Sequence, residues 1–191
     1  MRVIAGTLRS RALKAPPGLS TRPTSDRLRE TLFNVLAPRI EGSRFLDLYA
    51  GSGAVGIEAV SRGAAHVTCV EQSAAALTVL RANLNALNLA SHLRVEARSV
   101  AQFLSRATLA NQTFDLIFLD PPYDEGEEYV ATLGSLDTLL EPSGLVIVEH
   151  RRKQEVGAYF GRLSRRRILE QGDAALSFYS LEDSESCVLI K

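Results

Sequence analysis

The chain has 191 residues, 46% of them hydrophobic and 23% charged, a mixture typical of an ordinary globular protein. No apolar run approaches the roughly 18 residues that a membrane-spanning helix needs, and the first residues lack the apolar core of a secretion signal. Cys69 lies in an apolar run and is expected to be a buried free thiol, which suits a reducing compartment. We therefore expect a cytoplasmic protein without a membrane partner, and we also expect it to be a monomer.

Charge is distributed unevenly along the chain although the formal net charge is zero. Residues 1–44 hold nine Arg or Lys against three Asp or Glu, a balance of +6, and the remainder holds thirteen against nineteen, a balance of −6. Such an asymmetry is typical of a surface that binds a polyanion. A solvated basic N-terminus is the alternative.

The chain is expected to form one domain, residues 1–191, that begins with a basic arm over residues 1–25. Four residues of this arm, Pro16, Pro17, Gly18 and Pro23, limit it to at most a short hairpin. A core over residues 26–181 follows, and residues 182–191 are a tail or a final strand. The first helix is expected from a cap at residues 24–26 to about residue 36, with Pro38 ending it.

Strand and helix patterns alternate from residue 44 onward. The expected strands cover 45–49, 66–70, 93–96, 114–119 and 144–149, and the expected helices cover 54–62, 74–87, 100–109 and 129–140. This repetition with apolar strands predicts a doubly wound, mostly parallel α/β sheet. A short helix at 154–160 and an antiparallel hairpin of strands 163–169 and 174–181, turning at Gly172-Asp173, are expected to close it.

A glycine-rich loop follows the first strand and opens the next helix. The stretch 51–56 reads Gly-Ser-Gly-Ala-Val-Gly, and Glu71 ends the second strand twenty residues after Gly51. In this context glycines let the backbone approach a nucleotide, and the acid binds ribose hydroxyls. A tight turn with a solvated Glu71 is the alternative.

Asp47, four residues before Gly51, bears on which nucleotide binds. A carboxylate here would repel a pyrophosphate by roughly 4 kcal/mol at about 4 Å and an effective dielectric of about 20. S-adenosylmethionine carries no phosphate but has an ammonium and a sulfonium, which Asp47 can attract. The pattern therefore favours this methyl donor and the Rossmann-like fold of class I methyltransferases; capping of the following loop is the other reading of Asp47.

The tetrapeptide Asp120-Pro121-Pro122-Tyr123 directly follows the fourth strand, where doubly wound folds bind ligands. Asp120 and the Pro121 carbonyl can accept hydrogen bonds from one NH2 group and so aim its lone pair. Tyr123 offers a face on which a base can stack. The sequence therefore predicts methylation of an exocyclic amine, although Asp-Pro-Pro also occurs in ordinary strand-ending turns.

Other groups of polar residues predict less. Three scattered histidines lack metal-ligand spacing, so no metal site is expected. The basic clusters 151–153 and 165–167 either extend the polyanion surface or are solvated.

The chain resembles the bacterial RsmD-type methyltransferases, which act on guanine N2 of small-subunit (16S) ribosomal RNA. The resemblance extends from Arg2 to about Tyr179, and its most diagnostic stretch is Arg-Pro-Thr-Ser-Asp-Arg-Leu-Arg-Glu-Thr-Leu-Phe-Asn at 22–34. One departure is Ser10, where glycine is expected between two basic residues, and this could alter the turn of the arm. A second departure is Ser99, since many methyltransferases place Asp or Asn there to bond the adenine.

The resemblance implies ribosomal RNA as the partner, within a small-subunit assembly particle or naked. RNA would be bound by Arg9, Arg11, Lys14 and Arg22, and the flipped guanine by Asp120, Pro121, Pro122 and Tyr123. The cofactor S-adenosylmethionine would be held by Asp47, Tyr49, Ala50, Gly51, Ser52, Gly53, Val55, Glu71, Gln72, Ser99 and Val100.

Three alternatives remain open at this point. The chain could methylate a protein glutamine amide, although the enzymes that do so carry Asn-Pro-Pro-Tyr and a helical N-terminal domain. It could methylate another nucleic-acid amine, although no segment is large enough for a separate target-recognition domain. It could also be a non-catalytic RNA-binding module that has kept the fold.

Overall fold

The computed structural model describes residues 1–15, 25–121 and 126–182, and its backbone divides into two compact units, residues 1–100 and 101–191. None of the helices in these described ranges combines the length and the apolar character needed to cross a bilayer. Arg22, Pro122, Tyr123 and the expected tail after residue 182 lie outside the described residues. The single domain over residues 1–191 stays a prediction.

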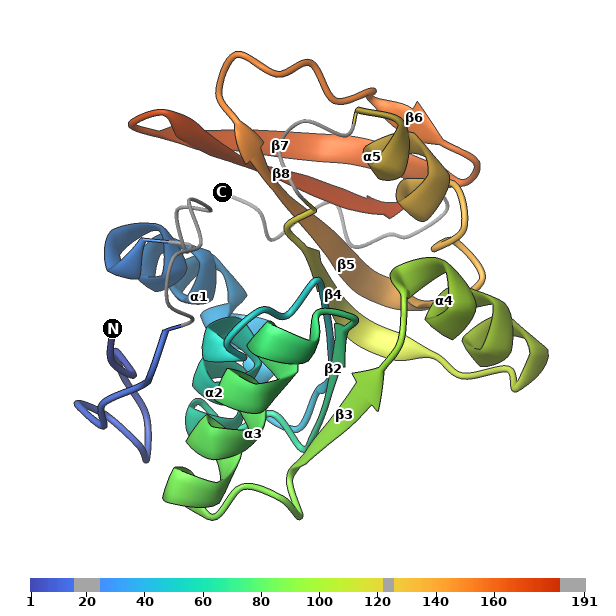
Figure 1. Ribbon diagram of the computed structural model, residues 1–191. Coiled ribbons are helices and arrows are strands. Elements are labelled where there is room, and N and C mark those ends of the chain that lie inside the picture. Colours follow the sequence, from blue (N-terminus) through green and yellow to red (C-terminus); the bar gives the residue numbers. More distant parts are fainter. Residues whose placement is uncertain (16–24, 122–125, 183–191) are drawn as a thin grey trace. The chain divides into compact units, whose positions relative to one another are not determined.

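The first unit is built on three parallel strands in the order β3-β2-β1 (Figure 1). Its elements are α1 (Asp26–Ile40), β1 (Arg44–Leu48), α2 (Ala54–Ser61), β2 (His66–Glu71), α3 (Ala74–Leu87) and β3 (Leu93–Ala97). Leu48 pairs with Val70, and Glu71 pairs with Ala97, so the carboxyl ends of the three strands align. Loops that follow these strands therefore emerge at one edge.

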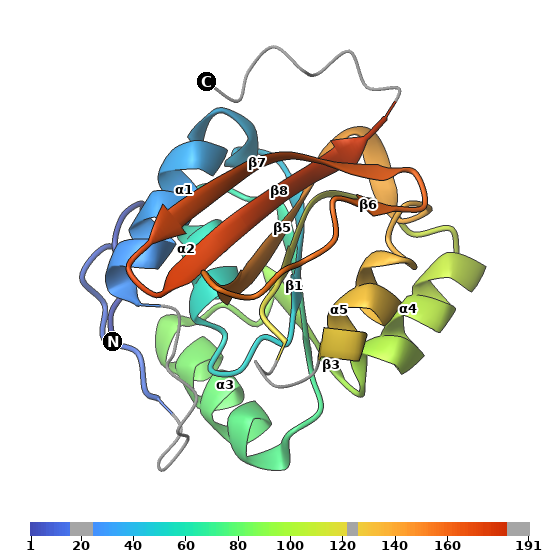
Figure 2. The same ribbon diagram turned by 90° about the horizontal axis from the view of Figure 1, so that it is seen from above.

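The three helices of this unit lie on the same side of its strands (Figures 1 and 2). Helix α1 begins at Ser25, whose side chain accepts a hydrogen bond from Leu28 N, and it buries one apolar face that includes Phe33. The Phe33 ring stacks on Phe45 of β1 with centroids 6.1 Å apart. Helix α3 begins at Ser73 in the same way.

The second unit contains one parallel strand pair and an antiparallel extension, in the order β4-β5-β8-β7-β6. After α4 (Val100–Leu109), which starts at the boundary, come β4 (Phe114–Leu119), α5 (Gly126–Leu133), β5 (Leu140–Arg151), β6 (Tyr159–Phe160), β7 (Leu163–Gln171) and β8 (Ala174–Leu181). Strands β4 and β5 run parallel, and the pairs β5–β8, β8–β7 and β7–β6 run antiparallel. The expected fold class is confirmed: a Rossmann-like α/β arrangement with an antiparallel C-terminal hairpin.

Two of the expected helices are wrong in part. Helix α1 continues past Pro38 to Ile40, because a proline in the last turn removes only one N–H, and Asn34, whose carbonyl this N–H would have bonded, is an exposed residue. The helix expected at 129–140 is α5, which runs from Gly126 to Leu133. Gly134 and a turn end it, and Leu140 already starts β5.

The helix expected at 154–160 does not form. Val156 is buried, its carbonyl accepts a hydrogen bond from Arg165 Nη1, and the Ala158 carbonyl accepts one from Arg165 N. Tyr159 and Phe160 then pair with β7 as a short edge strand. The segment bonds to β7 instead of to itself, so neighbouring strand geometry overrides its local helical pattern.

Candidate active site

The loop between β1 and α2 has an unusual backbone. Gly51 and Gly53 have φ of 55° and 78°, and Tyr49, which is not a glycine, has φ of 64°. A side-chain-bearing residue in this region costs on the order of 1 kcal/mol or more, a cost that folded proteins retain mainly at functional sites. Gly51 N donates to Glu71 Oε2 at 2.8 Å and Gly53 N to the Ala50 carbonyl at 2.8 Å, and these bonds fix the loop.

The glycines of this loop serve different purposes. A Cβ on Gly56 would lie 2.5 Å from Cys69 Sγ, so this glycine lets α2 pack closely on β2. A Cβ on Gly53 would lie 3.1 Å from a methyl of Leu80 on α3. Beside Gly51, by contrast, no atom of the described residues other than its chain neighbours lies within 4 Å of the place where a Cβ would be. The position beside Gly51 is therefore open, whereas those beside Gly53 and Gly56 are filled by neighbouring side chains.

Asp47 is buried, with 1% of its surface exposed, and its carboxylate lies against the start of α2. Asp47 Oδ2 accepts a hydrogen bond from Gly56 N at 2.9 Å and contacts Cys69 Sγ at 3.8 Å. Asp47 therefore bonds the first turn of α2 and not the loop that it was expected to cap in the alternative interpretation. A negative charge at a helix N-terminus is favourable, and it takes a place that a pyrophosphate would otherwise use.

Burial changes the acidity of this carboxyl. The pKa of Asp47 is raised from 3.8 to about 7, mainly by desolvation; the hydrogen bonds from Gly56 and Cys69 oppose this rise, and the nearby negative charge of Glu71 adds a smaller increase. The same burial raises the pKa of the Cys69 thiol well above its usual value. A cation that approached Asp47 would favour its ionised form and would be bound more strongly for that reason.

Glu71 connects the glycine loop with the loop after β2. Its Oε2 accepts from Gly51 N, and its Oε1 accepts from Gln72 N at 2.8 Å and Ser73 N at 2.7 Å. A carboxylate offers about four acceptor positions, so one remains for a ligand hydroxyl. The structure therefore brings Glu71 to the glycine loop, as the twenty-residue spacing predicts.

The other predicted cofactor residues lie around this edge of the first unit. Ser99 is half-buried after β3, and the Glu71 carbonyl accepts a hydrogen bond from Arg98 N at 3.1 Å, which keeps this segment beside the end of β2. Val100 is buried at the start of α4, Val55 is buried in the first turn of α2, and Gln72 is exposed. Which of them contact a cofactor stays a prediction.

Asp120 and Pro121 stand at the carboxyl end of β4 in the second unit. Asp120 is half-buried and Pro121 is buried. The negative charge of Asp120 contributes, after desolvation, to a raised pKa of the Tyr129 hydroxyl, which donates a hydrogen bond to the Glu149 carbonyl at 3.3 Å. This places an acidic acceptor near the strand end, where the sequence predicts the amine-binding group.

The basic arm is compact along its described residues. Arg2 pairs with Ala12 in an antiparallel bridge, Val3 and Leu13 are buried, and Leu13 N donates to the Met1 carbonyl at 3.0 Å. The side chains of Arg9, Arg11 and Lys14 are exposed, and residues 1–15 contain no acidic residue. The arm therefore presents an uninterrupted set of cations.

Two polar residues of α2 hold the arm, and the sequence did not point to either. The buried Glu58 accepts hydrogen bonds from Ile4 N at 2.8 Å and Ala5 N at 3.0 Å. The backbone carbonyl and hydroxyl of Ser61 accept from Thr7 N and Leu8 N at 2.8 and 3.0 Å. A charged residue within the apolar helix pattern of 54–61 is the signal that could have identified Glu58.

A third anchor comes from α3. Asn83 is buried, and its side chain bonds both to Lys14 in the arm and to Ser52 in the glycine loop. The sequence does contain a hint of this role. Asn83 is a polar residue on the face of the helix where Leu80, Leu84 and Leu87 are buried and where an apolar residue is expected.

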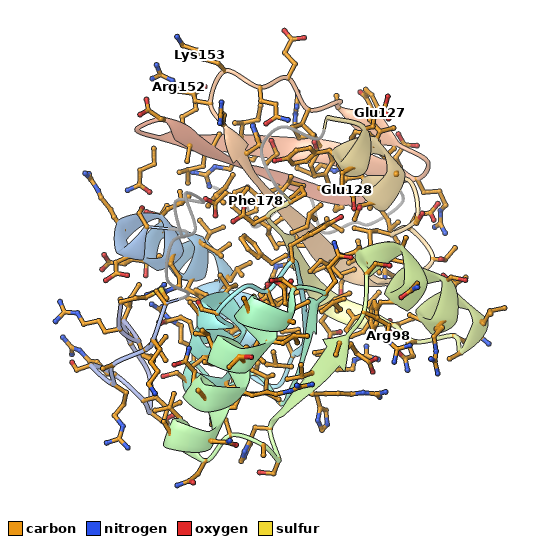
Figure 3. All side chains as sticks on the ribbon, viewed as in Figure 1. Arg98, Glu127, Glu128, Arg152, Lys153 and Phe178 are labelled. Atoms are coloured by element: carbon orange, nitrogen blue, oxygen red, sulfur yellow. The ribbon has the colours of Figure 1, made fainter. Side chains whose placement is uncertain are left out.

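The two later basic clusters differ from the arm and from each other. Arg152 and Lys153 project outward from the segment after β5 (Figure 3). Arg165 and Arg166 instead bond within the second unit, Arg165 to the Val156 carbonyl and Arg166 to Ser180 Oγ at 2.8 Å. The interpretation of 165–167 as a polyanion surface is therefore weakened for two of its three residues.

Comparison with known proteins extends over both units. A family model described as "Conserved hypothetical protein 95" matches residues 1–180. The chain is similar to the ribosomal RNA small subunit methyltransferase D of Escherichia coli strain K12, with 36% identity over 184 residues that cover 95% of this chain and 90% of that protein. The protein of the same name from Haemophilus influenzae is 40% identical over 152 residues, 78% of each chain.

A solved structure is also similar to the chain over most of its length. A hypothetical protein of Thermus thermophilus has a TM-score of 0.81 and 33% identity, and the match covers 95% of this chain and 99% of that one. The residues that the family model matches include the arm, the glycine loop and the segment after β4.

Proposed function

Because the chain belongs to the RsmD family of ribosomal RNA small subunit methyltransferases, we propose that it methylates the exocyclic N2 amine of a guanine in 16S ribosomal RNA with S-adenosylmethionine as the donor. The reaction takes place in the cytoplasm, and its substrate is the RNA itself or an assembling small-subunit particle. The enzyme acts as a monomer.

The observation that carries the proposal is the environment of Asp47. This carboxyl is buried, bonds the first turn of α2 and has a pKa raised to about 7 by desolvation. A carboxylate in such a place repels phosphate groups and attracts an ammonium group. S-adenosylmethionine combines a nucleoside with an ammonium and a sulfonium and has no phosphate, so its charges suit this site.

The remaining polar groups at this edge suit the same ligand. Glu71 keeps about one acceptor position for a ribose hydroxyl after its three backbone bonds. Gly51 leaves open space beside the loop. Ser99, at the end of β3, supplies a hydroxyl and backbone groups for the adenine in place of the usual Asp or Asn. When bound, the cofactor supplies an electrophilic methyl group.

The residues after β4 prepare the target amine. Asp120 and the Pro121 carbonyl accept hydrogen bonds from the two N–H groups of the amine, which fixes the nitrogen and directs its lone pair away from the ring. The ring of Pro121 fixes its φ, and the proline that follows restricts its ψ, so its carbonyl holds a constant direction and needs little reorganisation in the transition state. Pro122 and Tyr123 complete this group, Tyr123 as a stacking surface for the base.

The arm orients the RNA. Arg9, Arg11 and Lys14 are exposed cations on a segment without acidic residues, and Arg22 continues the series in sequence. Such side chains bind phosphates and set the position of the nucleic acid, and they carry no base specificity of their own. Base selection is therefore left to Asp120 and its neighbours.

The test is methylation of defined substrates. Labelled S-adenosylmethionine is incubated with the protein and either naked 16S RNA or small-subunit particles from cells that lack their own enzyme, and the digested nucleosides are separated. We expect label only in N2-methylguanosine, and far less of it with an Asp120→Ala variant in the same reaction time. Label in an adenosine or cytidine derivative, or in a protein glutamine, would contradict the proposal and identify the correct alternative.

A further inference from the structure

Asn83 of α3 joins two segments that are far apart in the sequence and that have different proposed ligands. Its Oδ1 accepts a hydrogen bond from Lys14 N at 2.8 Å, and its Nδ2 donates to the Lys14 carbonyl at 3.1 Å. The same Nδ2 donates to the Ser52 carbonyl at 3.0 Å. Lys14 belongs to the basic arm, and Ser52 belongs to the glycine loop.

The chemistry of the amide determines how it is oriented. The carbonyls of Lys14 and Ser52 lie against Nδ2 of the amide, and the N–H of Lys14 lies against Oδ1. If the oxygen and the nitrogen of the amide were exchanged, the amide oxygen would face two carbonyl oxygens, which cannot donate a hydrogen bond. Asn83 is 2% exposed, and water does not replace these bonds readily in a buried place. The amide therefore holds the backbones of Lys14 and Ser52 in one fixed relation.

We propose that Asn83 is a positioning residue that couples RNA binding at the arm to methyl-donor binding at the glycine loop. The inference rests on the proposed function, and it assigns a role to a side chain that contacts neither ligand. Donor contacts at the glycine loop stabilise the arrangement in which the Ser52 carbonyl meets the amide, and the amide in turn holds the Lys14 backbone in the arrangement that RNA binds. Each ligand therefore strengthens the binding of the other.

The hydrogen bonds distinguish Asn83 from the residues around it. Removing arm cations weakens RNA binding alone, and removing the Asp47 charge weakens donor binding alone. Asn83→Ala removes the connection and leaves both sets of ligand-binding groups in place. Asn83→Asp keeps an acceptor for Lys14 N but turns a carboxylate toward two carbonyl oxygens, so it breaks the connection as well.

The test measures the coupling factor directly. The dissociation constant of S-adenosylhomocysteine, which cannot transfer a methyl group, is measured by calorimetry with and without a saturating 16S RNA fragment. The dissociation constant of the RNA is then measured with and without S-adenosylhomocysteine. For each ligand, the coupling factor is the dissociation constant without the other ligand divided by that with it. In the wild type the two ratios are equal, as linkage requires, and we expect each to be at least about five. In Asn83→Ala and Asn83→Asp we expect both ratios to fall to about one.

A matched control separates coupling from general destabilisation. Asn85→Ala removes the same side chain from an exposed position of the same helix, and it should keep the wild-type coupling factor. Thermal melting verifies that each variant is folded at the assay temperature, and a folded but merely less stable protein keeps its ratio. A folded Asn83→Ala protein with the wild-type ratio, or a wild type whose ratio is one, would overturn the inference. Loss of donor or RNA binding in the wild type itself would instead remove the proposed function, and the inference with it.

Discussion

Replacement of Asp47 by asparagine should change how the stability of the ligand-free protein depends on pH. The folded protein holds this carboxyl at a pKa of about 7, raised from 3.8 mainly by desolvation. Between these two values the folded state binds a proton that the unfolded state does not. Stability from this group is therefore fully present below about pH 4, falls as pH rises and is lost once pH passes about 7.

The size of the effect follows from the shift. About three pKa units at about 1.4 kcal/mol each amount to roughly 4 kcal/mol across the whole window. Asparagine keeps a carbonyl oxygen that can accept the bond from Gly56 N but has no charge to bury. The variant should therefore lack this slope, and near pH 8 it should be the more stable protein by a few kcal/mol. The negative charge of Glu71, on β2, also raises the pKa of Asp47, by a smaller amount than desolvation does. The Cys69 thiol stays neutral over this pH range because its own pKa is raised.

Urea unfolding at pH 5, 6, 7 and 8 measures this prediction. The difference in unfolding free energy between Asp47→Asn and wild type is taken at each pH, because groups that titrate in both proteins cancel. The difference should increase with pH up to about 7 and then level off. The same variant should bind S-adenosylmethionine more weakly by about 1.5–3 kcal/mol, as expected for the loss of a charge-assisted bond. A difference that is constant over this range would refute the reasoning.

Three further predictions concern the target site and the arm. Asp120→Ala should leave donor affinity almost unchanged and lower turnover by about 100-fold or more in single-turnover assays, because its bonds matter most in the transition state. Removal of Arg9, Arg11 and Lys14 together should weaken RNA binding across sequences and flatten its salt dependence by up to about 0.7–0.9 log unit for each phosphate that is no longer neutralised. Ser10→Gly should raise the free energy of unfolding by about 0.5–1 kcal/mol in urea titrations, because Ser10 has φ of 67° and relief of this strain exceeds the added chain entropy of glycine.

Each of these predictions has a matched control. Asp120→Asn keeps one acceptor oxygen and should retain more activity than Asp120→Ala; equal, near-normal turnover in both would remove Asp120 from the site. Arg106→Ala deletes an exposed cation of α4 and should leave the salt dependence unchanged. An unchanged slope in the arm variant as well would exclude the arm from the RNA surface. A destabilised Ser10→Gly protein would show that the serine side chain contributes more than its backbone costs.

Periodic apolar patterns predicted most of the fold, and the reason is visible in particular elements. Helices 74–87 and 100–109 and strands 114–119 and 174–181 have the predicted bounds because their patterns are bounded by turn residues and are uninterrupted. The helix expected at 129–140 was extended too far because Leu136, Leu139 and Leu140 continue a helical spacing. These leucines are buried in a turn and at a strand start instead.

The candidate site was predictable to the extent that it depends on backbone motifs. The positions of Asp47, Gly51 and Glu71 follow from the order of strand, loop and helix, and the structure brings these three together. The anchors of the arm were not predictable in the same way. Glu58 and Asn83 act on residues more than fifty positions away, and nothing in the local pattern specifies such partners.

The attachment of the arm at both ends has a consequence for how it recognises a partner. Residues 4–8 are tied to α2 through Glu58 and Ser61, and residue 14 is tied to α3 through Asn83, so Arg9 and Arg11 extend from a closed loop with fixed ends. Ordering a free basic tail costs about 1–2 kcal/mol per residue when it binds. Here that entropy is lost when the protein folds, so a larger share of the energy of phosphate binding remains as affinity. For the proposed RNA substrate, such a loop would favour RNA whose phosphates already have the matching spacing, so that the shape of the RNA would be recognised before any base is read.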